Sequence, residues 1–168
     1  IVALHHEQNI FKMGGLKKYM PITYWTSLLG TLALIGFPGF SGFYSKDSII
    51  EAVHASHIYG AEFAYYAVLG GVFITALYSF RLFFLVFHGE ERMDHHTKEH
   101  LKESPWVVTV PLVLLAIPSV IIGGLTITNV LYGDYFSGVV FVQDAHNVLA
   151  HLKEDYHGAL AMIFWHAF

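Results

Sequence analysis

The sequence predicts an all-α protein, a polytopic transmembrane helix bundle of about four spans that includes one discontinuous (broken) helix. Three observations support this fold class. Only 13% of the 168 residues are charged, whereas a soluble domain carries about 25%. Three long stretches, residues 19–45, 63–89 and 104–133, contain almost no charge. The first of them is interrupted by GFPGFSG, whose glycines and proline are unsuited to continuous helix.

Composition excludes several classes of protein. The abundance of Leu, Ile, Val and Phe excludes a disordered chain. The chain has no cysteine, so disulfides, thiolate metal sites and thiol nucleophiles are excluded. No basic stripe indicates nucleic acid as a partner. The sequence begins without Met and stops within the apolar run GALAMIFWHAF, so we expect it to be part of a longer chain.

The first predicted span covers residues 22–56, after a loop at 1–21. Its apolar character runs from Ile22 to Val53. A continuous helix over that range would be about 48 Å long, too long for one straight span of a bilayer core of about 30 Å. Two full spans would need about 40 residues and a turn. We therefore expect one span made of two half-helices; the alternative is an ordinary Pro/Gly turn between two short helices.

The remaining elements follow from length and charge. Two stretches are apolar almost all round, which suits spanning or deeply buried helices. The expected order is a transmembrane helix at 63–88, a cytoplasmic-side loop at 89–104, a transmembrane helix at 105–132, an opposite-side segment at 133–157 and the start of a truncated span at 158–168.

The basic residues predict the orientation. The loop before the first span has three Lys or Arg, the next has none, the loop at 89–104 has three and the segment at 134–157 has one. Basic loops alternate with poor ones only if residues 22–56 form a single span. By the positive-inside rule, the loops at 1–21 and 89–104 then lie on the cytoplasmic or matrix side.

A polar stripe on the second half-helix, expected at 43–56, is the candidate site. Lys46 lies near the break, and Asp47, Glu51 and His54 share a neighbouring helix face. Ionisable groups inside a membrane are costly and normally mark a pathway or relay. Loss of hydration disfavours an ammonium and a nearby carboxylate favours it, so a change in either can make a lysine release a proton. The alternative is that Ser45-Lys46-Asp47 begins an exposed helix.

Arg81 and the histidines have plainer interpretations. Arg81 is two turns from the basic loop, so snorkelling to the interface is favoured over pairing with an intramembrane carboxylate. No HExxH motif accompanies the histidines around 95–100, and a solvated loop is favoured over a metal site. The pair at 5–6, with His54 and His57, is a candidate set of proton carriers near pathway mouths.

Two long motifs carry a resemblance to a known family. HHEQNIFKMGGLKKYMPITYW and LALIGFPGFSGFYSKDSIIEA resemble the antiporter-like membrane subunits of respiratory complex I, the NADH–quinone oxidoreductase, and LYSFRLFFLVFHG extends the similarity to about residue 90. The resemblance implies a bundle with two inverted repeats, each containing a broken helix. It implies that Lys46 is the lysine of the second broken helix, near the proton exit, and that Asp47 is the acid beside it.

The resemblance also implies partners and location. The chain would belong to an enzyme complex without doing redox chemistry, because no nucleotide-binding or haem-ligation pattern occurs in it. FMN, iron–sulfur clusters and quinone are expected in partner subunits. The expected partners are other membrane-arm subunits of complex I, especially the neighbouring antiporter-like subunit, and the lipid bilayer. The expected location is the bacterial inner membrane, or the mitochondrial inner membrane for an organellar protein.

Two other functions remain open at this stage. One is a subunit of a multi-subunit cation/proton antiporter, or of an energy-converting hydrogenase; the Lys-Asp pair favours complex I over the Lys-Glu pattern expected there. The other is a purely structural membrane scaffold, in which Lys46 and Asp47 would be replaceable.

Overall fold

A computed structural model describes residues 2–4, 7–143 and 146–166, so His5 and His6 lie outside the described residues. The described part is helical and contains no strand, which confirms the predicted all-α class. Its elements in order are η1 (Val2–Leu4), η2 (Ile10–Lys12), η3 (Leu16–Lys18), α1 (Pro21–Ile35), α2 (Ser41–His54), α3 (Ala61–Phe87), α4 (His95–His100), α5 (Trp106–Val130), α6 (Val148–Glu154) and α7 (Ala159–His166).

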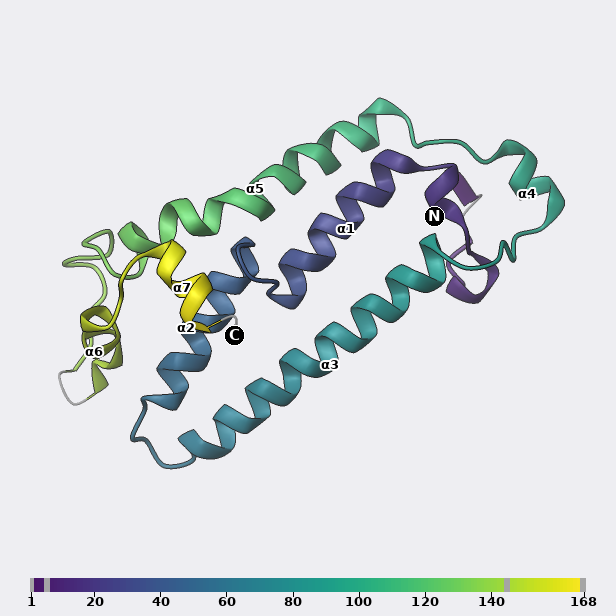
Figure 1. Ribbon diagram of the computed structural model, residues 1–168. Helices are drawn as coiled ribbons and strands as arrows, with labels where there is room; N and C mark the ends of the chain where they lie inside the picture. Colours follow the sequence, from purple (N-terminus) through teal and green to yellow (C-terminus); the bar gives the residue numbers. More distant parts are fainter. Residues whose placement is uncertain (1, 5–6, 144–145, 167–168) are drawn as a thin grey trace.

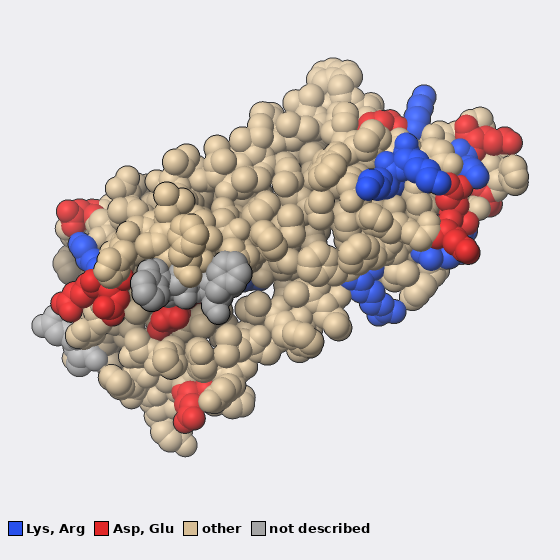
Figure 2. Space-filling model, in the orientation of Figure 1, with Lys and Arg blue, Asp and Glu red and all other residues tan. Residues whose placement is uncertain are grey.

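Helices α3 and α5 are long and apolar enough to cross a membrane. At about 1.5 Å per residue they are roughly 40 Å long. In the most apolar window of each helix only 11% of the residues are buried within the chain, which differs from a helix in the core of a soluble protein. Charged side chains gather at the two ends of the molecule, with a broad uncharged band between them (Figure 2). The outer surface of both helices therefore suits lipid or other apolar helices.

Helices α1 and α2 are consecutive in the chain and pack against the same two helices, α3 and α5. Each long helix therefore runs past the interruption at residues 36–40 (Figure 1). Helix α2 begins at Ser41, two residues before its expected start at residue 43. Four long helical segments thus form three roughly parallel rows, with α6 and α7 at the end of the bundle where α2 lies.

The end of α1 has a clear local cause. Gly36 adopts φ +80°, a left-handed conformation that favours glycine. The Phe37 amide then donates to the Leu32 carbonyl at 2.9 Å, and the Gly36 amide donates to the Ala33 carbonyl at 3.2 Å. This pair of bonds is the usual glycine stop of a helix, and Pro38 follows closely, where helix cannot continue.

Two buried clusters hold the helices together, one at each end of the bundle. The first joins the N-terminal segment to α1, α3 and the residue after α4, and the second joins α2, α5 and α7. The first contains Leu4, Met13, Leu16, Met20, Tyr24, Phe83, Phe87 and Leu101, and the second contains Phe43, Tyr44, Ile127, Tyr132 and Met162.

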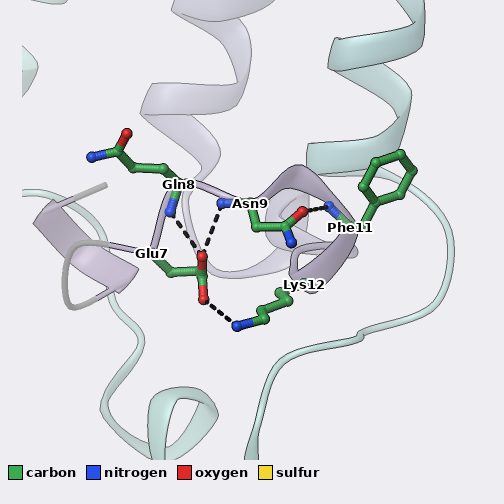
Figure 3. Close-up of polar contacts among 5 residues, drawn as sticks. All are labelled: Glu7, Gln8, Asn9, Phe11 and Lys12. Atoms are coloured by element: carbon green, nitrogen blue, oxygen red, sulfur yellow. Dashed lines mark hydrogen bonds and ion pairs between the residues drawn. The ribbon is translucent and has the colours of Figure 1, made fainter.

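Loops 7–20 and 88–105 meet at the end of the bundle beyond α1 and α3, and we call this the basic end because six of the nine Lys and Arg residues lie there. The loop at 7–20 is organised locally by one carboxylate (Figure 3). Glu7 Oε1 accepts the amides of Gln8 at 3.0 Å and Asn9 at 2.9 Å, and its Oε2 pairs with Lys12 at 3.1 Å. The Asn9 side chain in turn accepts the Phe11 amide at the start of η2.

Candidate functional site

Lys46 reaches from α2 back to the end of α1. Its Nζ donates to the carbonyl of Leu34, one of the last carbonyls of α1, which has no partner within its own helix. Gly36 leaves room for the lysine stem, because a Cβ there would lie 3.2 Å from Lys46 Cδ. The ammonium therefore sits at the C-terminal end of α1, where the helix dipole favours a positive charge.

Asp47 and Glu51 lie on the side of α2 that borders a cavity of about 690 Å³. Their i, i+4 spacing brings both carboxyl groups to this one volume, as the helical period predicts. One oxygen of the Asp47 carboxylate is buried. The cavity is lined from α2, α3, α6, α7 and the connecting segments by Asp47, Ile50, Glu51, Leu69, Tyr132, Leu152, Asp155, Tyr156, His157, Gly158, Ala161 and Met162.

Four polar residues in this lining are absent from the candidates found by sequence analysis. Tyr132 follows α5, and Tyr156 stacks on it with ring centroids 4.0 Å apart. The Tyr156 hydroxyl is 2.8 Å from Thr128 Oγ1. Asp155 and His157 lie on the segment between α6 and α7, and His157 Nδ1 is 2.6 Å from the Asp155 carbonyl oxygen. For the last three, the string Glu-Asp-Tyr-His in the sequence is the only signal, and nothing local connects it with α2; Tyr132 has no such signal.

The other two sequence candidates lie away from this cavity. His54, at the end of α2, is exposed, and its ring lies tilted against that of Tyr65 of α3, with ring centroids 4.8 Å apart. Arg81 lies over the Phe11 ring of the basic end, 5.9 Å from its centroid. It is twelve residues along α3 from Leu69, the α3 residue in the cavity lining, which is about 18 Å of helix. This position matches snorkelling to the interface rather than pairing with Asp47 or Glu51.

The histidines of α4 form an exposed pair. His96 and His100 have ring centroids 5.0 Å apart, and His95 lies 3.7 Å from Glu99. Among the residues that the structure describes, no group of three His, Asp or Glu side chains has a geometry that could hold a metal ion.

The site thus has two sides that differ in charge. On one side of α2, an ammonium contacts a carbonyl at a helix end. On a neighbouring side, two carboxylate residues line a cavity that is also lined by tyrosine, aspartate and histidine residues. Such an arrangement can hold a proton on a lysine and offer acidic and histidine acceptors along one direction, toward the end of the bundle formed by α6 and α7.

The long apolar helices suit a membrane protein, and sequence comparison points to a class of antiporter-like membrane subunits. Residues 1–75 match the family described as NADH:quinone oxidoreductase/Mrp antiporter, transmembrane.

The curated relatives carry the names of particular subunits, and the chain spans about a quarter or less of their length. The chain is 54% identical, over 97% of its length, to NADH-quinone oxidoreductase subunit L of Neisseria meningitidis serogroup A, and covers 27% of that protein. It is 45% identical, over 73% of its length, to NADH-quinone oxidoreductase subunit L of Rhodobacter capsulatus, and covers 18% of that protein. It is 47% identical, over 75% of its length, to NADH-ubiquinone oxidoreductase chain 5 of Dictyostelium citrinum, and covers 19% of that protein. The resemblance is therefore confirmed: the chain is homologous to part of the complex I subunits named L and chain 5.

Proposed function

We propose that this chain is part of a proton-translocating membrane-arm subunit of NADH–quinone oxidoreductase. In this proposal, Lys46 holds a proton at the helix break and passes it to Asp47 and Glu51. From there the cavity leads toward Asp155 and His157. The observation that carries the proposal is the placement of an ammonium and two carboxylate residues on neighbouring faces of one helix that begins at a break.

We further propose that α1 and α2 are the two halves of one membrane span. Support comes from their packing: α3 and α5, each long enough to cross, both run along α1 and α2. Irregular backbone at membrane depth needs partners for its polar groups. The Lys46–Leu34 contact supplies one of them, so the lysine both completes the break and occupies the relay position.

The wider assignments rest on the relatives' names. We propose that other membrane-arm subunits of complex I, above all the neighbouring antiporter-like subunit, pack against this chain in the bacterial or mitochondrial inner membrane. FMN, iron–sulfur clusters and quinone would be held by partner subunits. The matched family also includes Mrp antiporters, but the named relatives are oxidoreductase subunits and favour the complex I function over an antiporter or hydrogenase subunit.

The test uses the full-length gene in its own cell, with Lys46→Met. Inverted membrane vesicles are assayed for NADH oxidation and for NADH-driven proton uptake, after assembly of the complex has been checked. We expect a loss of proton uptake in the assembled complex, because methionine keeps most of the apolar stem but has no proton to transfer. Wild-type values for both activities would refute the relay role and favour a scaffold or an antiporter-type subunit.

The matched control is Lys153→Met. Among the described residues, Lys153 is the other lysine on α2, α6 and α7, and it is exposed on α6. Because it does not line the cavity, its loss should leave proton uptake per NADH at the wild-type value.

A further inference from the structure

The first residue of α2 makes a contact with α5 that the relay proposal does not use. Ser41 Oγ donates to the carbonyl of Pro118 at 2.8 Å and accepts the amide of Gly123 at 2.9 Å. The three residues lie on helices that are about 80 positions apart in sequence, so one hydroxyl group joins two backbone groups of α5 to the start of α2.

Helix α5 is unusual at the level of this contact. Pro118 has no amide hydrogen, so it cannot bond to the carbonyl four residues before it, and the helix is weakened there. Five residues later, a Cβ on Gly123 would lie 2.6 Å from Ser41 Cα and 2.8 Å from the Tyr44 ring. Only glycine at this position allows α2 to approach so closely, and the approach brings Ser41 within hydrogen-bonding distance.

The same stretch of α2 is held on a second side. Ser41 faces α5, whereas Lys46, five residues later, reaches the end of α1. Five residues correspond to about 140° of rotation around the helix, so the two contacts are on well-separated faces. Together they fix the height and the rotation of the first turns of α2 between α1 and α5. A shift of α2 along α5 would move the lysine away from the Leu34 carbonyl.

We propose that Ser41 is a positioning residue for Lys46: by bridging Pro118 and Gly123 it fastens the start of α2 to α5 and keeps the lysine at the end of α1. The proposal rests on the proposed function in so far as Lys46 carries protons. The bridge itself is a feature of packing and can be tested separately.

The experiment uses Ser41→Ala in the full-length protein, within the purified complex and in inverted vesicles. Hydrogen–deuterium exchange is measured for peptides that cover residues 119–126. Without the hydroxyl the Gly123 amide loses a partner, and we expect its exchange to be about tenfold faster. Proton uptake per NADH oxidised should fall at least about twofold, because small misplacements of a reacting group are costly.

Two serine variants are matched controls. Among the described residues, the Ser45 hydroxyl donates to the Gly42 carbonyl within α2, and the Ser119 hydroxyl donates to the Leu115 carbonyl within α5. Ser45→Ala and Ser119→Ala should leave both readouts at wild-type values. Gly123→Ala disrupts the same contact from α5, because the added methyl group would push α2 away, and it should reproduce the Ser41→Ala result. In a Lys46→Met background, Ser41→Ala should cause no further loss of proton uptake.

The outcomes separate the two proposals. Unchanged exchange in Ser41→Ala would overturn the bridge whatever Lys46 does. Faster exchange with unchanged proton uptake, in a protein whose Lys46→Met variant does lose uptake, would show that Ser41 holds α5 without positioning the lysine and would overturn the proposal. Failure of the proposed function would show in Lys46→Met alone, with the exchange result still deciding the bridge.

Discussion

The basic end and the opposite end of the bundle, where α2 meets α6 and α7, are built in different ways. At the basic end, charged side chains bind backbone groups and one another. The Arg92 guanidinium donates to the carbonyls of Phe11 at 3.0 Å, Ile10 at 3.4 Å and Leu85 at 2.7 Å, tying the N-terminal loop to α3. At the opposite end, Asp47, Glu51, Asp155 and His157 surround a cavity.

The difference indicates that the two ends are suited to different roles. Side chains that satisfy backbone groups lower the freedom of the loops they join, so the basic end is suited to fixing the helices relative to one another. Carboxyl and imidazole groups around an open volume can exchange protons with water, so the opposite end is suited to transfer. Variants at the basic end should therefore change stability and leave proton uptake intact, whereas variants of the proposed relay should lower proton uptake.

The largest expected effect comes from Lys46→Arg. Arginine keeps the positive charge at the end of α1 but does not release its proton in proteins. We expect proton uptake per NADH to fall at least about tenfold, with assembly close to normal. Lys153→Arg, at an exposed site of the same end, should have no effect. If the Lys46→Arg variant takes up protons normally, the lysine acts through its charge alone. The proposed difference in role between the basic end and the opposite end is then wrong.

A smaller effect, on stability only, is expected from Glu103→Ala. Glu103 Oε2 accepts the amides of Ile22 at 2.7 Å and Thr23 at 3.3 Å, and its Oε1 accepts the Thr23 hydroxyl at 2.7 Å, so the carboxylate caps the start of α1. Loss of such a cap costs about 1 kcal/mol. Hydrogen–deuterium exchange at residues 22 and 23 should be about fivefold faster.

The control for this variant is Glu99→Ala on the exposed surface of α4. It should leave exchange at residues 22 and 23 unchanged. Proton uptake per NADH should stay at the wild-type value in both variants. A loss of uptake in Glu103→Ala without loss of assembly would mean that the basic end takes part in transfer.

Much of this arrangement follows from local sequence. The lengths of α3 and α5 follow from their apolar runs, and the interruption between α1 and α2 follows from Gly36 and Pro38. The common face of Asp47 and Glu51 follows from the helical period. These features depend on residues close together in the chain, so composition and spacing are enough to predict them.

The features that sequence analysis missed depend on packing between distant segments. Ser41 meets Gly123 across 82 positions, and Glu103 caps a helix that begins 82 positions earlier. Asp155 and His157 reach the α2 cavity because the two flanking helices, α6 and α7, both pack on α2. The local sequence around such a serine, glutamate or histidine does not predict a distant partner, because the same residue could equally well be exposed to solvent.

The smallest expected effect is a pH dependence at the basic end. Glu91 Oε2 lies 2.6 Å from Lys98 Nζ, and Glu91 Oε1 is 3.1 Å from the Tyr19 hydroxyl. The hydrogen bond from Lys98, followed by that from Tyr19, lowers the pKa of Glu91 below its ordinary value of 4.5. A carboxyl whose pKa is lower in the folded state stabilises that state above its ordinary pKa. The stabilisation is lost as the pH falls through the lowered value.

Cleavage of the loop at 89–104 by pepsin between pH 5 and pH 3 should reveal this step. The wild type should resist at pH 5 and be cut faster as the pH falls, whereas Lys98→Met should be cut faster already at pH 5 and show a smaller step. Glu7, Glu90, Asp94, Glu99 and Glu103 share this end and are the same in both proteins, so the difference between the two proteins isolates the Glu91–Lys98 pair. Salt should shrink that difference, because the pair is close to solvent. An equal rise in cleavage rate in both proteins as the pH falls would show that the Glu91–Lys98 pair does not stabilise this loop. The contacts of Arg92 and Glu103 would then be the ones that hold the basic end together.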